Sequence, residues 1–141
     1  MAAVSHIFNK PIAMTNYQPL SSLYLRETDL YLPRLLKSKK NNKLLNFDNL
    51  FSLPNTMGIA DGFYENIIEV DVITNTEDEI TEIVEEMLEY TSKEYKIDDT
   101  RSFHQQKIDS FINNNNPLFF KDLNFKAKIG KKFLERHKNL I

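Results

Sequence analysis

Polar and aromatic side chains that can recognise a sugar or a nucleotide base follow the first apolar run of the chain. Residues 12–14 form that run, which lacks polar alternation and therefore predicts a strand covered on both faces. Asn16 and Gln18 offer amide donors and acceptors, and Tyr17 offers a ring for stacking. Because ligands of open parallel sheets bind beyond the carboxyl ends of the strands, these three are candidate substrate-binding residues. The alternative, a polar loop with a packed tyrosine, stays open.

Ser5 is a fourth candidate for substrate binding, because it lies in a short helix that the sequence predicts just before this strand. The helix begins almost at Met1 and breaks at residues 9–11, where a proline removes a backbone donor. The Ser5 hydroxyl near the helix start can contact a ligand, or it can serve as a plain N-terminal cap. Both interpretations stay open.

Other residue types that carry chemistry give no site. The chain lacks cysteine, which excludes disulfides, thiolate metal sites and cysteine nucleophiles. Its histidines lack metal-ligand spacing, and its glycines form no loop that would cradle a phosphate. These residues are His6, His104, His137, Gly58, Gly62 and Gly130. We therefore expect no metal and no cofactor, and the sequence assigns no catalytic residue.

Length and charge limit the class of protein. With 141 residues, of which 41% are apolar, the chain can build one modest core, so we expect a single domain over residues 1–141. The net charge of −2 provides no basic field for nucleic acid. No stretch matches a secretory signal or approaches the ~20 apolar residues of a membrane span. We expect a cytoplasmic protein that neither spans a membrane nor binds DNA or RNA.

The strongest helix signal begins at Thr76. Thr76 and Glu79 have capping-box spacing, and apolar residues recur behind them at helical intervals. This apolar stripe comprises Ile80, Ile83, Val84, Met87, Leu88 and Thr91. The opposite face is acidic, and we interpret it as a solvated face that favours the helix dipole rather than as paired catalytic carboxylates.

Two further helices are predicted towards the C-terminus. The first begins near Thr100, and its inward residues are Phe103, Lys107, Ile108 and Phe111. The second begins near Phe125, is basic, and has as its inward residues Ile129, Phe133, Leu134 and His137. The basic helix either packs beside the acidic helix or remains independently solvated, since exposed ion pairs contribute only ~0–1 kcal/mol each.

These elements predict an α/β fold. A short parallel sheet is expected from the strands at Ile12 and Val70, covered by the helices from Thr76, Thr100 and Phe125. Residues 17–66 are expected to form an irregular segment that wraps this core, with a short extended piece at 29–33 and a turn of helix capped by Asp48. The prediction is a small Rossmann-like three-layer domain.

Several segments together resemble a known family. They read SHIFNKPIAMTNYQP at residues 5–19, DLYLPRL at 29–35, NTEDEI at 75–80, EEM at 85–87 and GKKFL at 130–134. In order and spacing they are similar to the C-terminal part of a bacterial family of glycosyltransferases linked to surface polysaccharide synthesis. The resemblance covers most of the chain.

The resemblance implies a two-lobed GT-B fold, of which this chain is the C-terminal lobe or a fragment of it. Such a lobe binds a nucleotide sugar, here through Ser5, Asn16, Tyr17 and Gln18. The glycine- or serine-rich turn that precedes the phosphate-binding helix in such lobes is missing, so activity without a separate N-terminal lobe or partner chain is not expected. The alternative function is a small noncatalytic α/β interaction module that lost the active cleft.

Overall fold

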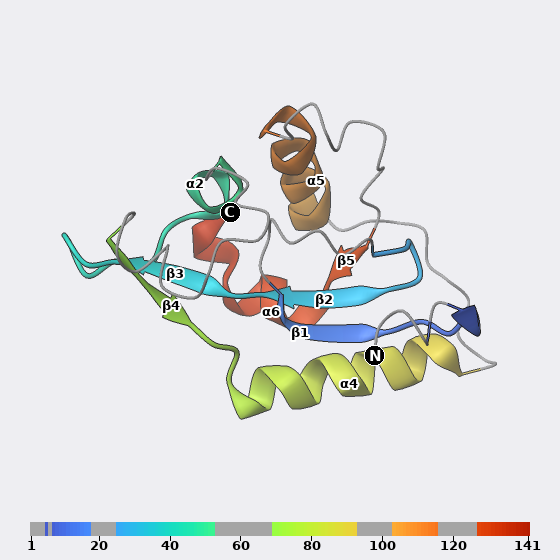
Figure 1. Ribbon diagram of the computed structural model, residues 1–141. Helices are drawn as coiled ribbons and strands as arrows, with labels where there is room; N and C mark the ends of the chain where they lie inside the picture. Colours follow the sequence, from blue (N-terminus) through green and yellow to red (C-terminus); the bar gives the residue numbers. More distant parts are fainter. Residues whose placement is uncertain (1–4, 6, 18–24, 53–68, 93–102, 116–126) are drawn as a thin grey trace.

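A three-stranded parallel sheet organises the fold in the computed structural model, which describes residues 5, 7–17, 25–52, 69–92, 103–115 and 127–141. The strands are β1 (Ala13–Tyr17), β2 (Leu30–Pro33) and β5 (Lys128–Ile129), in the order β1-β2-β5 (Figure 1). Every residue of β2 is buried, whereas β1 is half-buried up to Asn16. β2 is thus the centre of the core, and the predicted α/β class and short parallel sheet are confirmed.

Helices lie on both sides of this sheet (Figure 1). α4 (Glu77–Thr91) lies on one side, and α5 (Phe103–Asn115) lies on the other side with α2 (Phe47–Ser52), while α6 (Lys131–Arg136) contacts α4. A Cβ atom placed on Gly130 would lie 3.1 Å from Leu32 and 3.6 Å from Ile83, so β2 and α4 leave room only for glycine or a small shift there. A short 3-10 helix, η2 (Lys138–Leu140), follows α6.

The strand at Val70 is not part of the parallel sheet, so the prediction that it shares this sheet with the strand at Ile12 is wrong. It is β4 (Val70–Ile73), which pairs antiparallel with β3 (Leu35–Ser38) in a separate two-stranded sheet. A single residue, Arg34, separates β2 from β3, and β3 brings the buried Leu35 and Leu36 to β4. β2 itself takes the place beside β1, in parallel register.

The described part of residues 17–66 holds regular elements, although the sequence favoured an irregular, wrapping course. β2, β3 and α2 all lie there, and the short extended piece at 29–33 is the central strand. The Asn46 side chain accepts a hydrogen bond from the Asn49 N–H at 2.9 Å, just before α2 begins at Phe47. Asn46 therefore has the capping role predicted for Asp48, which lies in the first turn instead.

α4 is the helix predicted from Thr76. Its capping box is present, because Thr76 Oγ1 accepts from the Glu79 N–H at 3.3 Å and Glu79 accepts from the Thr76 N–H at 2.9 Å. Ile83 is buried, but Val84 and Leu88 are 46% and 65% exposed, so the predicted inward stripe was too wide. Only the apolar residues of α4 that face the sheet are covered by the described core.

α5 is described from Phe103 onwards, and the predicted start at Thr100 lies outside the described residues. Ile108 is buried as predicted, whereas Phe103 is 74% exposed rather than inward. The helix contacts the sheet edge through Gln105, whose Oε1 accepts from the Ile129 N–H at 2.8 Å. That bond satisfies an outward N–H of β5.

The basic helix begins later than predicted. Phe125 lies outside the described residues, and the chain at Ile129 is a strand, so the helix α6 starts only at Lys131. The Gly130 N–H donates to the Tyr31 carbonyl at 3.2 Å, which commits this backbone to the sheet and delays the helix. A two-residue strand directly before a helix leaves no periodic signal.

Acidic α4 and basic α6 are neighbours, as one of the two sequence alternatives predicted. Arg136 Nη2 lies 2.8 Å from Glu82 Oε1, and Lys132 Nζ lies 3.3 Å from Glu85 Oε2. The Lys132–Glu85 pair is exposed, so it contributes only about 0–1 kcal/mol, whereas Glu82 in the other pair is partly buried. Both pairs orient α6 along α4.

A buried carboxylate ties together the amino ends of β1 and β2. Asp29, which is fully buried, accepts from the Ile12 N–H at 3.1 Å and from the Arg26 N–H at 2.7 Å. The Arg26 guanidinium lies 3.5 Å from Asp29 and also donates to Asn9 Oδ1 and the Lys10 carbonyl. This end of the sheet is therefore closed by hydrogen bonds within the protein.

Candidate functional site

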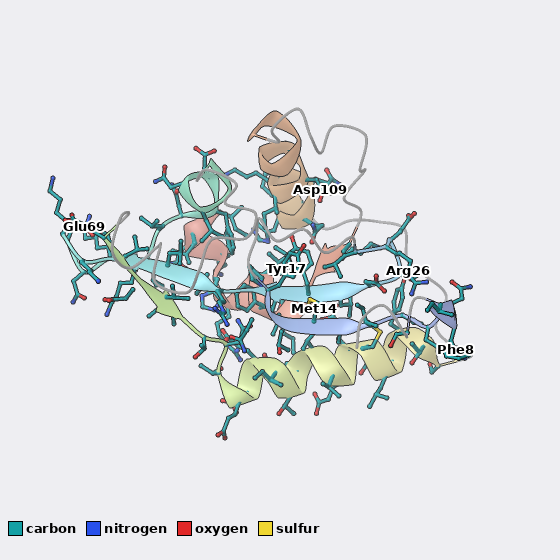
Figure 2. The ribbon with its side chains drawn as sticks, in the orientation of Figure 1. Phe8, Met14, Tyr17, Arg26, Glu69 and Asp109 are labelled. Carbon is teal, nitrogen blue, oxygen red and sulfur yellow. The ribbon has the colours of Figure 1, made fainter. Side chains whose placement is uncertain are left out.

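The candidate site lies at the carboxyl ends of β1 and β2, which meet because the strands are parallel. Tyr17 is in register with Pro33, and the Arg34 N–H donates to the Tyr17 carbonyl at 2.9 Å. Arg34 therefore lies beside Tyr17, the residue that follows Asn16, at the ends of neighbouring strands. Figure 2 shows Tyr17 at this end of β1, and Arg26 and Phe8 at the opposite end.

Asn16 is fixed by a reciprocal pair of hydrogen bonds with Asn75. The Asn16 N–H donates to Asn75 Oδ1 at 2.6 Å, and the Asn75 N–H donates to Asn16 Oδ1 at 2.7 Å. Asn16 adopts φ 52°, where the register with β2 shifts, and this left-handed backbone suits asparagine. The Asn16 carboxamide nitrogen donates to no group in the described part of the chain. It is a donor held in place at the strand end.

Asn75 is a positioning residue that the sequence analysis did not single out. It is 8% exposed, and its Nδ2 also donates to the Pro33 carbonyl at 3.1 Å. It thus joins the ends of both strands to the start of α4. The signal available in the sequence was an asparagine directly before the capping-box threonine.

Tyr17 packs beneath the edge instead of projecting from it. The side chain is 3% exposed, and its ring meets Tyr31 edge-on at a centroid distance of 5.3 Å. Burial, with smaller contributions from Tyr17 and Asp109, raises the pKa of Tyr31 well above its usual value, so Tyr31 stays neutral. This geometry matches the packed tyrosine of the two alternatives.

The other two predicted residues are not brought to this edge. Gln18 lies outside the described residues. Ser5 lies before β1, where its carbonyl accepts from the Lys10 N–H at 2.9 Å, at the amino end of the strand (Figure 1). The structure thus separates Ser5 from Asn16 by the length of β1.

Arg34 is the cation at the carboxyl edge, and the sequence analysis missed it. The residue is partly buried, and its Nε atom is buried without a hydrogen-bond partner. Its guanidinium forms no ion pair with any residue that the structure describes. The signal in the sequence was a basic residue directly after a strand-like segment, at the position where ligands meet parallel sheets.

The start of α4 lies beside this edge but is already occupied. Glu79, which is 5% exposed, accepts from the Thr76 N–H, and its Oε1 lies 2.7 Å from His137 Nε2. Burial acts to raise the pKa of Glu79, but hydrogen bonds from His137 and Thr76 outweigh it and hold that pKa below its usual value. Glu79 therefore stays ionised and joins α4 to the end of α6.

No family model, curated protein or solved structure matches this chain. Among the described residues, no three histidines or carboxylates are grouped to hold a metal ion. The helices described here are all too short or too polar to cross a bilayer. The chemistry that this end of the molecule can offer is hydrogen-bond donation from Asn16 and positive charge from Arg34.

Proposed function

We propose that this chain is the nucleotide-sugar-binding lobe of a glycosyltransferase of bacterial surface polysaccharide synthesis. The observation that supports the proposal best is the carboxyl edge of the parallel sheet, where Asn75 holds Asn16 in place and the Asn16 amide nitrogen donates to no described group. Ligands of open α/β sheets bind at this edge. The resemblance of the sequence to the glycosyltransferase family favours a nucleotide sugar as the ligand.

The proposed role of the chain is binding rather than catalysis. Asn16 would donate to a hydroxyl or carbonyl group of the donor, and Asn75 would keep Asn16 in position. Glu79 is the carboxylate beside this edge, and its oxygens are taken up by Thr76 and His137. The general base and the acceptor site would then come from an N-terminal lobe or a partner chain.

Calorimetric titration with nucleoside diphosphates and nucleotide sugars tests this proposal. The informative variant is Asn16→Asp, because aspartate keeps the oxygen that accepts from Asn75 and tolerates a left-handed backbone, but lacks the amide donor. We expect saturable binding that weakens about tenfold or more in Asn16→Asp, since one lost hydrogen bond and one added negative charge oppose a phosphorylated ligand.

The matched control is Asn139→Asp, which makes the same chemical change at an exposed position in η2. It should bind like the unmodified chain. Equal affinity of Asn16→Asp and the unmodified chain would contradict the role of Asn16. Absence of binding up to millimolar ligand would contradict the proposed function itself.

A noncatalytic interaction module is the second candidate function. Large apolar side chains are exposed at the start of the chain and along α4, namely Ile7 (78%), Phe8 (70%), Val84 (46%) and Leu88 (65%). Exposed apolar side chains of this size favour contact with another protein surface. A nucleotide-binding lobe can also carry such a surface, so the titration decides between the two functions.

A further inference from the structure

We infer that Arg34 holds a phosphate group of the ligand at the carboxyl edge of the sheet. The inference rests on the proposed function and names the part of the ligand that meets this edge. It starts from the Arg34 guanidinium, which is partly buried and has no partner in the described chain. The Nε atoms of Arg34 and Arg26 are both buried without an acceptor, but the terminal nitrogens of Arg26 are bonded. Buried polar groups are normally paired, so an unpaired one at a candidate site requires a reason.

Arg26 shows how this fold treats an arginine with a structural role. Its guanidinium donates to Asn9 and Lys10 and pairs with the buried Asp29. Arg34, at the other end of the same two strands, has none of these contacts. The difference indicates that the Arg34 guanidinium is kept for a group outside the described chain.

The position of Arg34 favours a phosphate. Its backbone N–H binds the carbonyl of Tyr17, the residue after Asn16, and the Asn16 amide nitrogen is also uncommitted in the described chain. Two such donors on adjacent strand ends suit an anion with several acceptor oxygens. Arginine binds phosphate through charge-assisted, often bidentate hydrogen bonds.

Other positive groups near this edge are already engaged. The start of α4, a common phosphate site in α/β proteins, is closed by the capping box and carries the ionised Glu79. Arg136 is committed to Glu82 at 2.8 Å and lies 3.8 Å from Glu79. Among the described residues at this edge, Arg34 is the cation that remains for an anion.

Titration with inorganic pyrophosphate tests the inference, with uridine and a uridine diphosphate sugar as comparison ligands, at ~0.15 M ionic strength to limit nonspecific attraction. Pyrophosphate should bind the unmodified chain and bind Arg34→Gln about tenfold or more weakly, since hydrogen bonds to charged groups are the strong ones. Arg34→Lys, which keeps the charge but not the bidentate fork, should fall between them. Lys138→Gln, a loss of the same charge at an exposed position, should bind like the unmodified chain.

The outcomes separate this inference from the proposed function. Equal pyrophosphate affinity of Arg34→Gln and the unmodified chain would overturn the inference. So would a uridine diphosphate sugar that binds more tightly than uridine but binds Arg34→Gln as tightly as the unmodified chain, and the proposed function would then survive. Pyrophosphate binding that depends on Arg34, without any preference for the nucleotide sugar, would support the phosphate contact and overturn the nucleotide-sugar function.

Discussion

Replacing Arg34 by methionine should leave the free energy of unfolding unchanged or raise it, whereas the same replacement of Arg26 should lower it strongly. Both arginines are partly buried and flank β2. Methionine keeps most of the apolar stem of arginine and removes only the guanidinium. The pair of variants therefore compares one chemical change in two environments of the same sheet.

The contacts of each residue set the expected magnitudes. A buried donor without an acceptor costs about 1–3 kcal/mol, so removing the Arg34 guanidinium, which is only partly buried, should raise the unfolding free energy by about 1 kcal/mol. Removing Arg26 leaves Asp29 buried without its charged partner, a loss of about 3–5 kcal/mol. Asp29 keeps two backbone donors, which places the loss near the lower value, about 3 kcal/mol.

Urea unfolding followed by far-ultraviolet circular dichroism measures this difference. With an m value of about 2 kcal/mol/M, a difference of about 4 kcal/mol separates the two midpoints by about 2 M. The m values should agree between variants, so that the midpoints report stability alone. If Arg34→Met unfolds at as low a urea concentration as Arg26→Met, Arg34 has a structural partner and the argument for a phosphate contact fails.

Two further predictions concern α4. Because the pKa of Glu79 is lowered in the folded state, its contribution to stability is present above the unfolded pKa of about 4.3 and is lost as the pH falls through the folded value. The urea midpoints at pH 7 and below pH 4 should therefore differ less in Glu79→Gln than in the unmodified chain. An unchanged difference between the two midpoints would contradict the lowered pKa of Glu79. Ile83→Ala should lower the free energy of unfolding by about 2–5 kcal/mol, and Val84→Ala, at a neighbouring exposed position, by less than about 0.5 kcal/mol, as measured by urea titration; similar losses in both would show that Val84 is covered in solution.

Local signals predicted the elements that local chemistry determines. The capping box at Thr76 gave α4, and the apolar run before Asn16 gave β1, because both depend on residues close in sequence. The predicted place of the Val70 strand in the parallel sheet was wrong because the sheet that a strand joins depends on residues far away in the sequence. β2 was predicted as a short extended piece but not as the central strand, and β5, with two residues, is too short for periodicity to reveal.

The candidate site divides in the same way. Asn16 could be found from its place shortly after the apolar run 12–14, which predicts the carboxyl edge of a sheet, although the strand itself continues to Tyr17. The burial of Tyr17 depends on Tyr31 from the neighbouring strand, and the locking of Asn16 depends on Asn75. Contacts over such sequence separations leave no trace in a local pattern.

The contrast between the two ends of the sheet makes the carboxyl end the place to look for a ligand. At the amino end, Asp29 and the terminal nitrogens of Arg26 pair with each other and with nearby backbone, although the Arg26 Nε lacks an acceptor. At the carboxyl end, Asn75 bonds to the backbone of both strands, but the Arg34 guanidinium and the Asn16 amide nitrogen have no partners in the described chain. Since the fold pairs the charge of Arg26 with a carboxylate at one end of the sheet, the same pairing would have been possible for Arg34 at the other end. The unpaired donors therefore lie where an anionic ligand would supply the missing acceptors. A phosphate contact of Arg34 requires that the Arg34 guanidinium is dispensable for the stability of the fold.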